Sequence, residues 1–397
     1  MESKKVNYRF LTAYAFITVF TYGVIMNLRG VVNPLIQSDY SISYSQLGVV
    51  LSVYSIGSII STLIGGFLIR KVGLKKEFRT GFIVLSIGLI MISFIDRYVF
   101  LLITMLIIGL GIGLLMVGAN TLASRIFIKN KGRMMNIFHL FFGISGLLAP
   151  IYINQLFDLG FSWEQGYTLA ILLVALLFLI SLFSSFPQRS AQVKVKALPV
   201  KKLLKDKRVL GFMLTFALVV ALELGIVNWV GIYLSDIQQR SSTEIGFYVS
   251  AFFSFFILGR LVASIIIERF NYFKFIVFTI LATVVIAVVG VLGPDSFAIC
   301  FSISGFFISM TFPTLQAVMF EIFESDLAAL IGATLTAGEL GNIFFSNWLV
   351  GLLNDLLGIR VGFLVLISYG LLAVGVIYYI NYQEQRAIKE ALDNKTA

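Results

Sequence analysis

Long apolar runs alternate with short polar gaps along the whole chain. Each run is about 17 residues or more, and an α-helix needs about 20 apolar residues to cross the hydrocarbon core of a bilayer. The runs begin near Phe10, Ser45, Thr80, Tyr98, Met135, Gly166, Val209, Thr243, Phe273, Ser296, Leu327 and Arg360. We therefore predict an all-α integral membrane protein with twelve transmembrane helices.

The polar gaps divide the chain near its midpoint. The longest hydrophilic stretch is residues 188–208, and it separates six apolar runs from six. We predict an N-terminal six-helix bundle over residues 1–187, a cytoplasmic basic linker over 188–208, and a C-terminal six-helix bundle over 209–397. The division into equal halves suggests that the chain arose by duplication.

Two segments about half a chain apart support that duplication. Residues 109–127 and 305–323 both begin with Gly, share Ile at the fourth place and end in Ile-Phe. Internal repeats of this size are typical of transporters whose halves rock about a central site near the middle of the membrane. The pattern predicts two pseudo-symmetric bundles.

Positive charge gathers in every second gap. Of the 30 Lys and Arg residues, 25 fall on one side of the membrane if the N-terminus is placed inside. Because cytoplasmic loops carry an excess of Lys and Arg, we expect both termini in the cytoplasm, and a multi-pass protein of the bacterial inner (plasma) membrane. The net charge of +10 therefore faces lipid headgroups and is no sign of nucleic-acid binding.

The sequence lacks the residues that metal binding and nucleotide binding require. One histidine and one cysteine, His139 and Cys300, leave no cluster for a metal site. No nucleotide-binding loop is present, and the glycines at 109, 111 and 113 suit close helix packing better than phosphate binding. We expect no enzyme activity and no cofactor. The expected partners are a small-molecule substrate, protons and the lipid bilayer, and the expected state is a monomer.

The loop after the second run carries a recognisable motif. Residues 66–76 read GFLIRKVGLKK and resemble the G-x-L-x-D-R-x-G-R-K signature of the major facilitator superfamily, although Arg70 stands at the acidic place. The resemblance implies a twelve-helix transporter whose cytoplasmic gate involves this loop, with Arg70 and Lys71, and its twin after the eighth run. That twin contains Glu268 and Arg269, an acid and a base side by side.

Shorter matches are similar to the fucose and glucose proton symporters. They are Asn33-Pro34, Asn120-Thr121-Leu122, residues 133–143, Glu223 with Asn228-Trp229, and Phe312-Pro313-Thr314. Members of that family often carry an acidic residue in the first helix that serves proton coupling. The first run here has no Asp or Glu and has Arg29 instead.

Two acidic residues lie within apolar runs, where an ionisable group is costly and functional by default. Glu223 falls near the middle of the seventh run, and Glu339 lies in the eleventh with Asn342 three residues later. We predict that Glu223 carries the coupled proton and that Glu339 is a second proton or substrate group. The alternative for Glu223 is a hydrogen bond between packed helices, and the alternative for Glu339 is an ion pair with a cation on another helix.

Two arginines also lie within runs. Arg29 either reaches the outer membrane interface or faces the central cavity, where it would bind an anionic group or pair with a carboxylate such as Glu223. Arg260 is expected at the cytoplasmic gate, with an anion ligand as the alternative.

Amides in apolar helices suit the donor and acceptor pattern of sugar hydroxyl groups. The candidates for substrate contact are Asn120, Asn228, Gln316 and Asn342, with Trp229 as a stacking surface. Amides also hold membrane helices together, and that alternative stays open.

These observations favour a secondary transporter that moves a small polar solute, a sugar above all, by proton symport and alternating access. A proton-coupled exporter of hydrophobic drugs or lipids, and an organic-anion transporter that uses Arg29 and Arg260, are the alternatives on the same fold. The buried acids and the duplicated halves argue against a membrane receptor that transports nothing. A uniporter remains an alternative, because the first run lacks the acidic residue.

Overall fold

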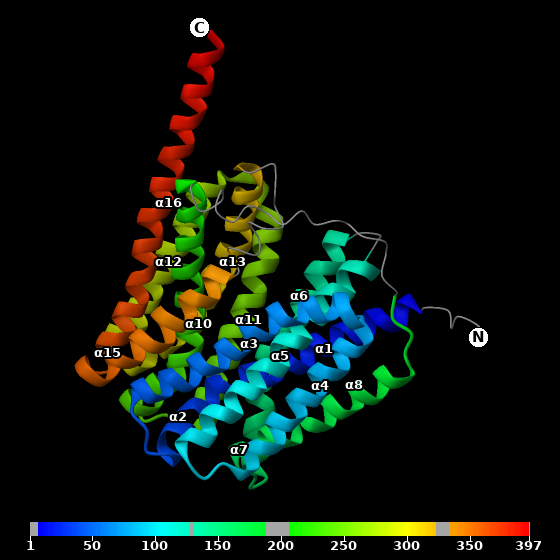
Figure 1. Cartoon of the computed structure of the whole chain (residues 1–397). Coiled ribbons are helices and arrows are strands. Elements are labelled where there is room, and N and C mark those ends of the chain that lie inside the picture. Colours follow the sequence, from blue (N-terminus) through cyan, green and yellow to red (C-terminus); the bar gives the residue numbers. More distant parts are fainter. Residues whose placement is uncertain (1–6, 128–130, 188–205, 323–333, 335, 397) are drawn as a thin grey trace. The chain divides into compact units, whose positions relative to one another are not determined.

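The computed structural model describes residues 7–127, 131–187, 206–322, 334 and 336–396 (Figure 1). Every regular element within these residues is a helix, and eleven helical segments are long and apolar enough to span a membrane. The all-α membrane fold is thereby confirmed. The eleventh predicted span, which starts near Leu327, falls partly on residues outside the described part, as do residues 188–205 of the predicted linker over 188–208.

The helices group into two compact units. Unit 1 comprises Met1–Val193 and Leu234–Phe253, and unit 2 comprises Lys194–Tyr233 and Ser254–Ala397. The end of the seventh span and the first half of the eighth therefore pack with the N-terminal helices. The predicted boundaries at 187 and 209 remain a prediction, because residues 188–205 of the linker lie outside the described residues.

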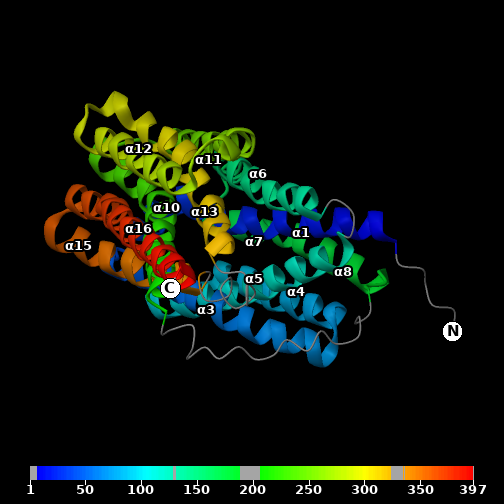
Figure 2. The ribbon, with the colours of Figure 1, turned by 90° about the horizontal axis from the view of Figure 1, so that it is seen from above.

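Unit 1 contains the helices of the first six spans. They are α1 (Tyr8–Asn27), α2 (Arg29–Asp39), α3 (Tyr44–Val72), α4 (Leu74–Met91), α5 (Tyr98–Ile126), α6 (Lys131–Asp158), α7 (Trp163–Leu169) and α8 (Ile171–Phe183). Polar residues start several of them: Ser43 and Gln46 form a capping box at α3, and Ser162 and Gln165 form one at α7. Figure 2 shows α4, α5 and α8 lying along one another.

Glycines bring the helices of unit 1 into backbone contact. A methyl group on Gly109 of α5 would collide with the Tyr54 carbonyl oxygen of α3, and one on Gly111 would lie 2.6 Å from the Leu85 backbone of α4. A methyl group on Gly113 would collide with the Ser61 hydroxyl of α3. The close-packing interpretation of these three glycines is confirmed.

Unit 2 contains the helices of the later spans. They are α10 (Lys207–Gln238), α11 (Ser242–Ile266), α12 (Tyr272–Leu292), α13 (Ile299–Ile322), the π helix η4 (Asn342–Leu349), α15 (Val350–Leu357) and α16 (Ile359–Thr396). The final turns of α10 and the first half of α11 belong to unit 1, as given above. Tyr44 of α3, for example, donates to the Asp236 carboxylate of α10 at 2.7 Å.

Contacts from neighbouring helices account for the π helix. The indole N–H of Trp229 in α10 donates to the Ser346 carbonyl at 2.8 Å, and the Tyr369 hydroxyl of α16 donates to the Phe345 carbonyl at 3.2 Å. Side chains that bond to helix carbonyls compete with the α-helical ladder, and π turns occur where that ladder is disturbed. Neighbouring helices thus favour the wider winding of this segment.

Candidate functional site

Arg29 lies at a break in the first span, where α1 gives way to α2. Its Nε donates to the Met26 carbonyl at 2.8 Å, and its guanidinium carbon lies 4.3 Å from the centroid of the Tyr54 ring. The residue is only 7% exposed, and its Nη1 atom is buried without a hydrogen-bond partner. Among the described residues, Arg29 is therefore a buried cation that rests on an aromatic face and has no carboxylate in direct contact. Its remaining N–H donors suit an electronegative ligand atom.

Asn120 is the other predicted substrate group in unit 1. Its side-chain nitrogen donates to the Met116 carbonyl one turn earlier in α5, at 2.9 Å, and the residue is half-buried. This bond fixes the amide on its own helix, so its role in substrate contact stays a prediction.

Glu223 and Arg260 come together in unit 2. They lie on α10 and α11, both are half-buried, and their charges interact although no direct ion pair joins them within the described residues. The Arg260 guanidinium carbon lies 4.5 Å from the centroid of the Phe256 ring, and its Nε atom has no hydrogen-bond partner. Because the two charges offset each other inside an apolar bundle, a proton on Glu223 changes the surroundings of Arg260.

Asn228 and Trp229 lie five and six residues beyond Glu223 in α10, and both are buried. Asn228 donates to the Asn347 side-chain oxygen at 3.1 Å, and Trp229 donates to the Ser346 carbonyl, as described above. Both contacts join α10 to the π helix. The geometry favours a role in holding these helices together over direct contact with a solute.

The remaining predicted groups of unit 2 lie on separate helices. Glu339 is half-buried one turn before Asn342, which is 2% exposed at the start of the π helix. Gln316 is half-buried in the second half of α13. Their roles in proton and substrate binding stay predictions.

The predicted gating residues are only partly described. Lys71 is exposed at the end of α3, and Arg269 is exposed in a short 3-10 turn after α11. The side chains of Arg70 and Glu268 lie outside the described part of the structure.

Three cations near the same loop hold the end of α8. Lys75 donates to two carbonyl groups at 3.0 and 2.8 Å, Arg79 to one of them at 3.4 Å, and Arg125 to a third at 3.3 Å. The acceptors are the carbonyl groups of Leu182, Ser184 and Pro187. The Leu182 and Ser184 carbonyl groups lie at the C-terminus of α8, where a cation also favours the negative end of the helix dipole, so these two contacts stabilise the end of α8.

The structure reveals one residue that sequence reasoning missed. Glu77 lies in the first turn of α4, between lysines and an arginine, where an acidic residue is expected to be solvated. It is 0% exposed, and neither carboxylate oxygen has a hydrogen-bond partner. The sequence did hold a signal, because Leu74, Phe78 and Gly81 mark the buried stripe of α4, and Glu77 falls on it.

Two effects oppose each other at Glu77. The N-terminus of α4 favours a negative charge by about 0.3–1 kcal/mol. Burial of an ionised carboxylate without a partner costs several kcal/mol. Burial is the larger effect, so the helix dipole does not offset the cost of a charge at this position.

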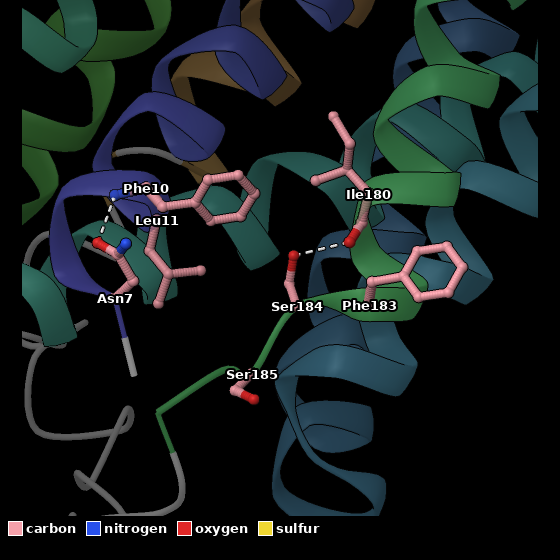
Figure 3. A pocket seen from close by; sticks show the side chains of 7 residues that line it. All are labelled: Asn7, Phe10, Leu11, Ile180, Phe183, Ser184 and Ser185. Carbon is pink, nitrogen blue, oxygen red and sulfur yellow. Dashed lines mark hydrogen bonds between the residues drawn. The ribbon is translucent and has the colours of Figure 1, made fainter. Parts of the chain in front are cut away.

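Two apolar hollows lie at helix ends outside these clusters. One, of about 460 Å³, is lined by Asn7, Phe10 and Leu11 of the α1 start and by Ile180, Phe183, Ser184 and Ser185 at the end of α8 (Figure 3). The other, of about 620 Å³, lies between the start of α10 and α16. They occupy equivalent places in the two repeats, the first and sixth spans and the seventh and twelfth. The first has no ionisable lining residue, and neither contains a predicted site residue.

Comparison with known proteins gives a family match over most of the chain. The model of the Major Facilitator Superfamily matches residues 14–344 and 234–395. A protein TsgA homolog of Buchnera aphidicola is 26% identical over 272 residues, which cover 68% of this chain and 69% of the relative. Protein TsgA of Escherichia coli is 22% identical over 338 residues, 84% of this chain and 85% of the relative.

Solved structures share the fold. The nucleoside transporter NupG matches with a TM-score of 0.81 and 14% identity, over 93% of this chain and 99% of the other. The D-xylose-proton symporter matches with a TM-score of 0.72 and 16% identity, over 94% and 97% of the two chains. The E. coli fucose:proton symporter FucP matches with a TM-score of 0.65 and 17% identity, over 94% and 99%. At these identities the likeness is one of fold alone.

Proposed function

Because this chain belongs to the Major Facilitator Superfamily, we propose that it is a secondary active transporter of a small polar solute, in the first instance a sugar, by proton symport. The observation that carries the proposal is the pair of half-buried, interacting charges on Glu223 and Arg260 in unit 2. Fucose and xylose proton symporters among the proteins of similar fold support the choice of solute and coupling ion.

The pair suggests how proton and solute are coupled. An ionised Glu223 offsets the charge of Arg260 and competes for its donors. A protonated Glu223 leaves Arg260 free to attract hydroxyl oxygens of the solute. Binding of the proton then raises the affinity for the solute, and by linkage the solute raises the affinity for the proton.

Each unit offers further groups that we propose for solute contact. They are the half-buried amide Asn120 and the donors of Arg29 in unit 1, and the half-buried amide Gln316 in unit 2. We assign Asn228 and Trp229 to the support of the π helix, in keeping with their burial. The two six-helix halves would alternate around the solute in a monomer of the bacterial inner membrane, with both termini in the cytoplasm.

Uptake into proteoliposomes tests the proposal. With a panel of labelled sugars and nucleosides, an inward proton gradient should drive accumulation, and a protonophore should abolish it. Glu223→Gln should lose accumulation against a gradient but keep exchange of labelled for unlabelled solute. Asp96→Asn, at an exposed loop position, is the matched control. Accumulation by Glu223→Gln at the wild-type level would remove Glu223 from coupling, and Glu339→Gln then tests the second acid.

One observation favours a second candidate, an organic-anion transporter. Arg29 is buried, and its Nη1 atom has no hydrogen-bond partner, as expected for a group that binds a carboxylate or phosphate of the solute. Inclusion of sugar acids and sugar phosphates in the panel separates the two. Arg29→Lys should then weaken transport of anions and leave neutral sugars little changed.

A further inference from the structure

The buried carboxyl group of Glu77 has a defined place in unit 1. A methyl group on Gly118 of α5 would collide with its Oε2 atom, and one on Gly65 of α3 would lie 3.6 Å from its Oε1 atom. The side chain therefore projects between α3 and α5, into space that Gly118 leaves open. At this seam of helix packing, a side chain in place of Gly118 would take the room that the carboxyl group occupies.

In the described part of unit 1, no counter-charge contacts Glu77. From α1 the ionisable group near enough to interact with it is the Tyr14 hydroxyl, which donates to the Leu177 carbonyl. On α4 itself and on α5, Lys75, Arg79 and Arg125 donate to carbonyl groups at the end of α8. Within the described residues, no cation contacts the carboxylate; the side chain of Arg70 lies outside them.

From this packing we propose that Glu77 is a proton-binding site of unit 1, occupied in the conformation seen here. An ionised carboxylate in this seam would lack both water and a hydrogen-bond donor, whereas a neutral carboxyl group fits without that cost. The inference is separate from the proposed function, which places the coupled proton on Glu223 in unit 2. It adds a second acid whose charge state depends on how α3, α4 and α5 pack.

The proposal has a consequence for pH. The unfolded chain ionises this carboxyl group above about pH 4.3. If the folded protein keeps the proton, the folded state binds more protons than the unfolded state, and its stability falls as pH rises. Glu77→Gln, a neutral group of the same shape, removes this contribution.

The contribution of Glu77 to the pH dependence of stability is measured by unfolding the full-length protein in mixed micelles at pH 5 and pH 8. Between these values, the unfolding constant of the wild type should rise about tenfold or more relative to that of Glu77→Gln. Asp96→Asn should keep the wild-type dependence on pH, because Asp96 is exposed. An equal pH dependence of wild type and Glu77→Gln would overturn the proposal.

Infrared spectroscopy supplies an independent readout. At pH 7 the wild-type protein should show a protonated carboxyl C=O band that Glu77→Gln lacks and that Glu223→Gln retains. Absence of a difference between wild type and Glu77→Gln would contradict the assignment. Glu77→Leu, which removes the carboxyl group and needs no hydrogen-bond partner, gives the same comparison if Glu77→Gln does not fold. Neither result depends on the identity of the transported solute, so the proposed function can fail while this site stands, or the reverse.

Discussion

The indole N–H of Trp229 gives a direct test of how the C-terminal unit is held together. Trp229 is fully buried in α10, and its Nε1 donates to the Ser346 carbonyl at 2.8 Å. Trp229→Phe keeps an aromatic ring and removes this donor. The Ser346 carbonyl group then loses the partner that comes from α10, within a segment whose winding differs from an α-helix.

The expected cost follows from that loss. A buried acceptor left without its partner costs about 1–3 kcal/mol, and the smaller ring adds part of the cost of a small cavity. We therefore expect Trp229→Phe to lower the free energy of unfolding by about 2–3 kcal/mol. The affinity for solute should change little, because the residue is 0% exposed and bonded to the π helix.

The assay is unfolding by SDS titration in mixed micelles, with transport measured on the same preparations. Trp348→Phe is the matched control, because Trp348 lies in the same π helix and is 48% exposed. Trp348→Phe should change the stability by less than about 0.5 kcal/mol. If Trp229→Phe retained full stability and instead raised the KM for the solute, the supporting role of Trp229 would be refuted and the stacking role predicted from sequence would return.

Three further predictions test the packing of each unit. Gly109→Ala should lower the free energy of unfolding by more than about 3 kcal/mol or prevent insertion, because the added methyl group meets the Tyr54 carbonyl oxygen. Gly375→Ala is the control and should be neutral, because its methyl group meets nothing within 4 Å. Equal expression and stability of the two variants would contradict the close helix packing at Gly109. Lys75→Gln should speed proteolysis or amide exchange at the end of α8, because Lys75 donates to the Leu182 and Ser184 carbonyl groups. Lys76→Gln, at the exposed neighbouring position, should leave both rates unchanged. Arg208→Gln should cost about 1 kcal/mol at pH 7, since Arg208 bridges Asp206 and Glu384 at 3.0 Å each. Partial burial opposes ionisation of Asp206, but hydrogen bonds from the Arg208 guanidinium and from backbone N–H groups hold the pKa of that carboxyl below its ordinary value. The stabilisation from ionised Asp206 is therefore complete above about pH 5 and is lost as pH falls below about 4. The free energies of unfolding of wild type and Arg208→Gln should then become equal in acid. A difference that persists in acid would argue against the ion pair.

Much of this protein is determined by its sequence. Length and hydropathy of the apolar runs place the spans, because a bilayer demands about 20 apolar residues in each crossing helix. The glycines of α5 predicted close helix packing, because only a residue without a side chain allows backbones to touch. The acid in the seventh run identified Glu223 as a candidate, since ionisable groups are rare in membrane helices.

Other features depend on contacts between residues far apart in the chain. Glu77 looked solvated among basic neighbours, and only the packing of α3, α4 and α5 buries it. Asn228 and Trp229 are predicted from the sequence to contact a sugar, and only the tertiary structure shows that both donate hydrogen bonds to the π helix. Hydrophobic patterning reports which residues leave water, because burial on a helix face is periodic in sequence. It does not report which polar group finds a partner, since that partner comes from another helix and its place is set by tertiary packing.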